Sequence, residues 1–151
     1  MGALNYVRAA CYESPNEGDA AERWPSTMTR GVKTILIVDD NVDCRELLAT
    51  LFATCGHDAR QAEDGASALQ AIAAQRPHVV VLDIGLPDMD GYEVAARIRA
   101  VPENRAILLI ALSGYGQPEH RRKSLEAGCD LHLLKPVDIN ELMAEIDAVP
   151  S

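Results

Sequence analysis

The feature of the sequence that most constrains its fold is a repeated alternation between short apolar runs and longer segments with helical periodicity. Runs rich in Ile, Val and Leu are typical of strands that are buried on both faces of a sheet. Four of the runs are strongly apolar, and the second along the chain is weaker. The five expected strands are 35–38, 57–62, 79–82, 107–112 and 131–134.

Each expected strand is followed by an expected helix. Asp64 can cap the second helix, and Asp138 with Glu141 resembles a capping box for the fifth. The apolar residues that recur at helical spacing in the first helix are Leu47, Leu48, Leu51, Phe52 and Cys55. Because parallel neighbours need long right-handed crossovers, five such pairs predict an α/β fold, the flavodoxin-like (βα)5 doubly wound parallel sheet with strand order 2-1-3-4-5.

Length and charge narrow the classes of protein that fit. A chain of 151 residues suits one domain. The net charge of −9 opposes direct binding of nucleic acid, since affinity for phosphate backbones depends on clustered Lys and Arg. Residues 1–30 mix acidic, Ser, Pro and Gly residues and bury little surface, so we expect a flexible N-terminal tail or linker there and a folded domain over 31–151.

The sequence also indicates where in the cell the protein is expected. No stretch approaches the apolar length that crosses a bilayer, so we expect a cytoplasmic protein without membrane insertion. The four cysteines, Cys11, Cys44, Cys55 and Cys129, show no metal-binding spacing. We expect them to be reduced thiols.

The most informative polar residues are those that end successive strands. Asp39 and Asp40 follow the first strand, Asp83 the third, Ser113 the fourth and Lys135 the fifth. In a doubly wound sheet, ligands bind beyond the carboxyl ends of the strands, near the switch point between strands one and three. We therefore expect these five side chains to meet in one crevice.

Such a crevice has a definite chemistry. Carboxylates roughly 4 Å apart repel one another by about 4 kcal/mol per pair at an effective dielectric near 20, unless a cation intervenes. Mg²⁺ favours oxygen ligands and is commonly completed by substrate phosphate oxygens, so it is the expected cofactor. Beside Mg²⁺, the Asp83 carboxylate can attack a phosphoryl group while Ser113 and Lys135 stabilise the transferring oxygens.

Four short motifs carry a resemblance to a known family: VDDN at 38–41, DIGLPDMDG at 83–91, ALSG at 111–114 and LKP at 134–136. With these motifs in this order, the sequence resembles the receiver domain of two-component response regulators. The resemblance extends over residues 33–149.

The resemblance implies a role for each acidic residue of the crevice. Asp83 would be the phosphoacceptor and part of the Mg²⁺ site. Asp40 and the carbonyl of Gly85 would bind Mg²⁺ directly, and Asp39 would act through bound water.

The resemblance also implies a switch. Ser113 would sense the phosphoryl group, and Lys135 would pair with it. His132 stands three residues before Lys135, where relatives usually carry an aromatic residue that changes rotamer with phosphorylation. Ser113 and His132 are therefore the expected switch residues, and the surface of the fourth helix, fifth strand and fifth helix would change to regulate a partner.

A sensor histidine kinase or a histidine phosphotransfer protein would supply the phosphoryl group from a phosphohistidine. The sequence does not indicate the downstream effector. A domain of this kind is not an enzyme toward other substrates and promotes only its own phosphorylation and dephosphorylation. The chain is expected to be either a stand-alone regulator or one domain of a hybrid kinase.

Two other classes share part of the pattern. A phosphatase of the haloacid dehalogenase type needs a D-x-D motif after the first strand, whereas residues 39–43 read DDNVD and a lone Asp ends the third strand. A flavin-binding domain of similar topology needs a Ser/Thr/Gly-rich phosphate loop at the same place. Acidic residues there would repel the flavin phosphate, so both classes fit less well.

Overall fold

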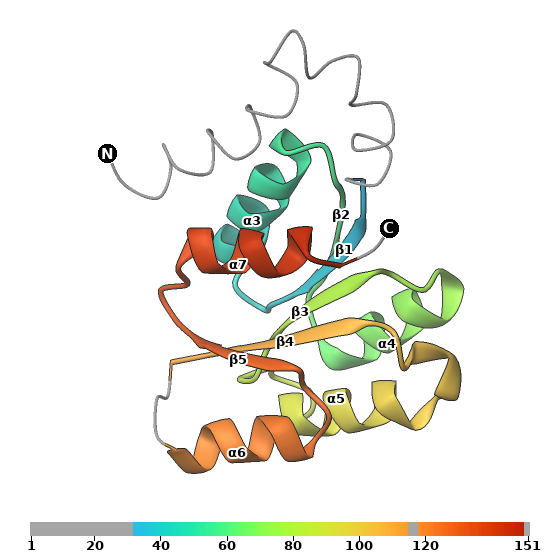
Figure 1. The fold of residues 1–151 in the computed structure, drawn as a ribbon. Helices are drawn as coiled ribbons and strands as arrows, with labels where there is room; N and C mark the ends of the chain where they lie inside the picture. Colours follow the sequence, from blue (N-terminus) through green and yellow to red (C-terminus); the bar gives the residue numbers. More distant parts are fainter. Residues whose placement is uncertain (1–31, 115–117, 150–151) are drawn as a thin grey trace, which may run out of the picture.

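The computed structural model describes residues 32–114 and 118–149, so the predicted tail at 1–30 lies outside the described residues. The five strands form one sheet in the order β2-β1-β3-β4-β5, and every neighbouring pair is parallel. This confirms the predicted flavodoxin-like topology (Figure 1). The strands are β1 (Thr34–Val38), β2 (Asp58–Ala62), β3 (Val79–Asp83), β4 (Leu108–Ser113) and β5 (Leu131–Leu134).

The helices begin at capping residues, two of which the sequence identified. The Asp64 side chain accepts a hydrogen bond from the backbone of Ser67 in a full capping box, and Asp138 accepts from the backbone of Asn140 and Glu141. The helices are α3 (Val42–Thr54), α4 (Gly65–Ala74), α5 (Gly91–Ala100), α6 (Pro118–Glu126) and α7 (Ile139–Asp147), with a short 3-10 turn η1 (Pro102–Asn104).

Two apolar layers cover the sheet, one on each face. Helices α4 and α5 bury Ile72, Val94 and Ile98 against the residues of β1, β3 and β4 that point to their side. On the opposite face, α3 and α7 bury Phe52 and Ile146 against the alternate residues of the same strands. All five residues of β3 are buried, as expected for a central strand covered on both faces.

The structure corrects two predictions made from the sequence, one about the apolar face of α3 and one about the cysteines. Leu47 belongs to the predicted apolar stripe of α3 but is 61% exposed, because Leu48, Ala49 and Phe52 form the edge that faces the sheet. Cys44 and Cys129 have free thiols, as expected, but Cys55 is disulfide-bonded, so the expectation of reduced thiols is wrong at that position.

The topology brings the ends of β1 and β3 together. Val38 pairs with Leu82, so the residues that follow, Asp39 on one strand and Asp83 on the other, lie at neighbouring positions. The chain leaves β1 toward α3 on one face and leaves β3 toward α5 on the other, which opens the sheet edge between them (Figure 1). Within residues 32–114 and 118–149, no helix is long and apolar enough to span a bilayer.

Candidate functional site

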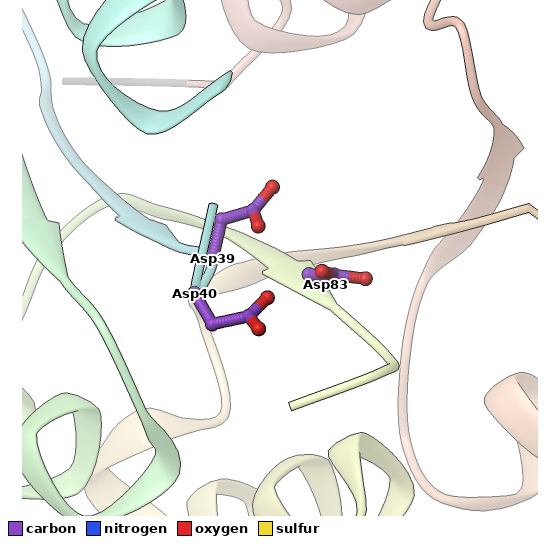
Figure 2. A group of neighbouring side chains, drawn as sticks. All are labelled: Asp39, Asp40 and Asp83. Atoms are coloured by element: carbon purple, nitrogen blue, oxygen red, sulfur yellow. The ribbon is translucent and has the colours of Figure 1, made fainter. Parts of the chain in front are cut away.

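Three carboxylates meet at this edge of the sheet. Asp39 and Asp40 follow β1, Asp83 is the last residue of β3, and Figure 2 shows the three side chains close together. Each offers an oxygen atom, and these oxygens all lie within 4.8 Å of one another. Asp39 and Asp83 are buried, whereas Asp40 is exposed. The cluster therefore opens to solvent on the side of Asp40.

Backbone amides orient the two buried carboxylates. The amide of Asn41 donates to Asp39 Oδ1 at 2.9 Å, and the amide of Gly85 donates to Asp83 Oδ1 at 3.1 Å. The guanidinium of Arg45 on α3 donates to the backbone carbonyl of Asp39 at 2.8 Å. These contacts fix the first turn after each strand, so the carboxylates are held in place before any ligand binds.

Lys135 reaches the cluster from the end of β5. Its Nζ lies 3.2 Å from Asp83 Oδ2 and 3.5 Å from Asp39 Oδ2. Its amide donates to the carbonyl of Ser113 at 2.9 Å, which holds the end of β5 beside β4. Burial lowers the pKa of Lys135, but the Asp83 and Asp39 carboxylates raise it more, so the pKa lies above its usual value and the ammonium stays charged.

The electrostatics of the cluster favour a bound cation. Burial raises the pKa of Asp39, and repulsion from Asp83 adds to this, while the amide of Asn41 and the Lys135 ammonium lower it; the net pKa is above the usual value for Asp. Three hard oxygen donors that face one another are the donor set that suits Mg²⁺ or a similar divalent ion. The residues present therefore fit a divalent metal.

Ser113 ends β4 on the same edge of the sheet. It is 2% exposed and pairs in register with Leu134, directly before Lys135. The amide of Ile84 donates to the carbonyl of Leu112, which places the residue after Asp83 beside the end of β4. The sequence predicts that the polar residues at the ends of four strands lie close together, and the structure brings them to one edge of the sheet.

His132 lies apart from the carboxylates, in the interior between β5 and α6. It is 7% exposed and pairs in register with Ala111, two residues before Ser113. Its Nδ1 lies 2.7 Å from Oγ of Ser124, a fully buried residue of α6. The Ser124 hydroxyl also donates to the carbonyl of His120 at 3.2 Å.

Sequence reasoning assigned no role to three residues that the structure connects with this region: Arg45, Asp88 and Ser124. Each acts through a partner that is distant in the sequence or belongs to another element. The charged group of Arg45 was visible, but nothing in the sequence indicates that it bonds to the carbonyl of Asp39. The tertiary fold alone defines these contacts.

Comparison with known proteins assigns the family. Residues 35–147 match the model of the response regulator receiver domain. Sporulation initiation phosphotransferase F of Bacillus subtilis is 39% identical over 108 residues, which cover 72% of this chain and 86% of that protein. The phosphate regulon transcriptional regulatory protein PhoB of Pseudomonas aeruginosa is 34% identical over 117 residues, 78% of this chain and 51% of PhoB.

Comparison with solved structures supports the same family assignment. A putative response regulator from Chloroflexus aurantiacus has a TM-score of 0.73 and 31% identity, over 78% of this chain and 96% of that one. The receiver domain of Saccharomyces cerevisiae Ssk1, solved in complex with the histidine phosphotransfer protein Ypd1, has a TM-score of 0.72 and 25% identity, over 78% and 88% of the two chains. The chain belongs to the receiver domain family of two-component response regulators, the signalling modules of phosphorelays.

Proposed function

We propose that this domain accepts a phosphoryl group on Asp83 from a phosphohistidine donor, in a reaction that depends on Mg²⁺. The observation that carries the proposal is the position of Asp83, which is buried beside two further carboxylates and has the Lys135 ammonium 3.2 Å from its own oxygen. A carboxylate oxygen attacks phosphorus, the bond from phosphorus to the donor imidazole breaks, and the imidazole nitrogen keeps the bonding electrons.

In this proposal each acidic residue has its own role in binding the metal. Asp40 and Asp83 supply carboxylate oxygens, the carbonyl of Gly85 completes the protein ligands, and Asp39 acts through bound water. Mg²⁺, when bound, neutralises charge on the transferring phosphoryl oxygens. Lys135 then exchanges its contact with the Asp83 carboxylate for one with the phosphoryl group.

The proposed partner is a sensor histidine kinase or a histidine phosphotransfer protein. Support comes from the Ssk1 receiver domain, a relative of known structure that was crystallised with such a transfer protein. In the proposal the domain promotes only its own phosphorylation and dephosphorylation and is not otherwise an enzyme. The effector is unidentified, and the cytoplasmic location and the absence of direct nucleic-acid contacts stay predictions.

The proposed output runs through Ser113 and His132. When the Ser113 hydroxyl turns toward the phosphoryl group, the change passes from the end of β4 to α6, which contacts His132 through Ser124. The surface formed by α6, β5 and α7 then changes its shape for a partner. Support comes from the buried position of His132 between Ser124 and the sheet.

Intact mass spectrometry tests the proposal directly. Acetyl phosphate with Mg²⁺ should add one phosphoryl group to the natural protein, and Asp83→Asn should remain unmodified because its amide is a poor nucleophile. Asp58→Asn, an exposed acid on β2, is the matched control and should be labelled like the natural protein. Labelling of Asp83→Asn, or labelling of the natural protein that survives a chelator, would contradict the proposed site.

The alternative classes make different predictions for the same sample. A phosphatase of the haloacid dehalogenase type would turn over a small phosphomonoester many times, and a flavin-binding domain would purify with a yellow colour. The match of residues 35–147 to the receiver family favours neither.

A further inference from the structure

Asp88 connects the loop after the phosphorylation site to a helix that lies elsewhere in the sequence. It belongs to the segment between β3 and α5, five residues after Asp83. Its Oδ1 accepts a hydrogen bond from the amide of Gly65 at 2.8 Å, and its Oδ2 accepts one from the amide of Ala66 at 3.0 Å. Both amides belong to the first turn of α4, so the two oxygens of one carboxylate hold two successive amides.

The first turn of α4 has an acceptor for each of its first three amides. Asp88 takes the first two, and the Asp64 side chain takes that of Ser67 at 2.8 Å. Amides at this end of a helix have no partner within the helix, so two separate carboxylates share the capping. The hydrogen bond from Gly65 is the largest of the effects that hold the pKa of Asp88 below its usual value, which indicates that the ionised form makes these contacts.

The loop is also fixed at its base and packed closely against α4. The amide of Gly91 donates to the carbonyl of Ile84 at 3.0 Å, which closes the loop on itself. A Cβ at Gly91 would lie 2.5 Å from Ile84 Cα, and a Cβ at Gly65 would lie 2.7 Å from Met89 Cγ, so both glycines permit the approach. Asp88 is therefore the polar anchor of a loop whose start, Gly85, bonds to the Asp83 carboxylate.

We propose that Asp88 is a positioning residue for the phosphorylation site, because it ties the loop that carries Gly85 to the first turn of α4. The inference rests on the proposed function, in which the carbonyl of Gly85 is a ligand of Mg²⁺. Without Asp88, the bond between Gly91 and Ile84 still closes the loop, but the segment between these two residues, which includes Gly85, loses both bonds to α4. Gly85 then samples more positions, and Mg²⁺ must order it on binding.

A reciprocal effect follows from linkage. If the position of α4 helps to order the Mg²⁺ site, then Mg²⁺ must help to order the first turn of α4 by the same factor. Hydrogen exchange of the Gly65 and Ala66 amides should therefore slow when Mg²⁺ is added. A carboxylate that only caps a helix would not produce this response, because the cap makes no contact with the metal ligands.

The test compares three variants in the full chain. Asp88→Ala removes both bonds, and Asp88→Asn keeps one carbonyl oxygen and so one bond. Asp64→Ala removes the other cap of the same helix, whose side chain bonds to Ser67 of α4. Mg²⁺ alone is titrated by calorimetry, with amide exchange measured by NMR and stability by thermal denaturation. We expect Asp88→Ala to bind Mg²⁺ about tenfold more weakly, the lower end of the loss seen when groups that orient metal ligands are removed. Asp88→Asn should be intermediate, and Asp64→Ala should bind like the natural protein.

The outcomes separate this inference from the proposed function. If the natural protein binds no Mg²⁺, the proposed function itself is wrong. If it binds Mg²⁺ and Asp88→Ala binds equally well, or if Asp64→Ala weakens binding as much, Asp88 is only a helix cap and the inference is overturned. If Asp88→Ala does not fold, Asp88→Asn provides the test. An unchanged affinity for Mg²⁺ and an unchanged protection of the Ala66 amide from exchange in Asp88→Asn would contradict the positioning role of Asp88.

Discussion

Replacing Asp39 by Asn should stabilise the protein without Mg²⁺ and destabilise it relative to the natural chain once Mg²⁺ is present. Apart from the exposed Asp40, whose repulsion is screened by solvent, the charge of Asp39 has two opposed neighbours. At an effective dielectric near 20, Lys135 at 3.5 Å attracts it by about 5 kcal/mol, while Asp83, with oxygens within 4.8 Å, repels it by about 3.5 kcal/mol or more. The two contributions nearly cancel.

The burial of Asp39 then decides whether Asp39→Asn raises or lowers the stability of the metal-free protein. Asp39 is 2% exposed, and removing a carboxylate from water costs several kcal/mol, which agrees with a pKa that burial raises. Asn has nearly the same shape and can still accept the hydrogen bond from the amide of Asn41. We therefore expect Asp39→Asn to gain about 1–2 kcal/mol without metal, a rise in Tm of about 4 °C for a domain of this size.

The pH dependence provides an internal check. Because the folded pKa of Asp39 is above its unfolded value of 3.8, its ionisation removes stability as pH rises through the folded pKa. The advantage of Asp39→Asn should thus be full above the folded pKa and vanish below the unfolded pKa, where the natural side chain is protonated in both states.

Thermal denaturation followed by circular dichroism, in a chelator and in excess Mg²⁺, measures all of this. The natural protein should gain stability from Mg²⁺ by mass action, and Asp39→Asn should gain less because it has lost one negative charge of the site. The order of the two Tm values should therefore reverse. A lower Tm for Asp39→Asn in the chelator, or an equal response of both proteins to Mg²⁺, would refute the reasoning.

Three further predictions concern residues outside the carboxylate cluster. Burial lowers the pKa of His57, so the contribution of neutral His57 to stability is complete above the unfolded pKa near 6.5 and declines as pH falls below that value. Thermal melts from pH 7.5 to 5 should show this decline in stability, and His57→Gln should make the decline smaller. Arg99→Ala should cost about 2 kcal/mol in urea unfolding, and Arg99→Lys should not restore it, because the guanidinium donates at once to the Gly128 carbonyl and to the Asp130 carboxylate. His132→Ala should leave phosphoryl uptake intact but reduce the NMR shift changes on α6 that accompany it; equal α6 changes in the variant and the natural protein would show that His132 has no part in the switch.

The fold was accessible from the sequence because its signals are local and agree with one another. Apolar runs such as Val79–Leu82 need cover on both faces, and the helical segments between them supply it, which leaves few topologies. The errors also have local causes. Leu47 has the right spacing for a helix but lies about 100° around it from Leu48, which is outside the narrow edge that α3 turns toward the sheet.

The carboxylate cluster was accessible for a different reason. Parallel strands end at one edge, so the residue at or just after the end of each strand is placed by topology alone. Asp39, Asp83 and Lys135 are therefore brought together without knowledge of side-chain packing. The bonds of Asp88 to α4 and of Ser124 to His132 are different, since they depend on the distance between helices and on side-chain rotamers. Alternation on β5 placed His132 on a face, but no local pattern indicates that a hydroxyl of α6 meets its Nδ1.

In the proposed function, the balance of charge at the cluster predicts an order of events in phosphorylation. Three carboxylates and the single ammonium of Lys135 leave two negative charges uncompensated, and a divalent cation compensates both, whereas a monovalent ion leaves one. When Asp83 forms a bond to phosphorus, its own charge passes to phosphoryl oxygens that lie farther out, and Lys135 must release the carboxylate to follow them. That release also removes its contact with Asp39, which is buried and has no other cation within a salt-bridge distance among residues 32–114 and 118–149. Movement of Lys135 before the metal binds would therefore leave Asp39 uncompensated. In the proposed function we accordingly expect the metal to bind first, and we expect phosphorylation without Mg²⁺ to be opposed by the burial of Asp39 as well as by the missing ligand for the phosphoryl oxygens.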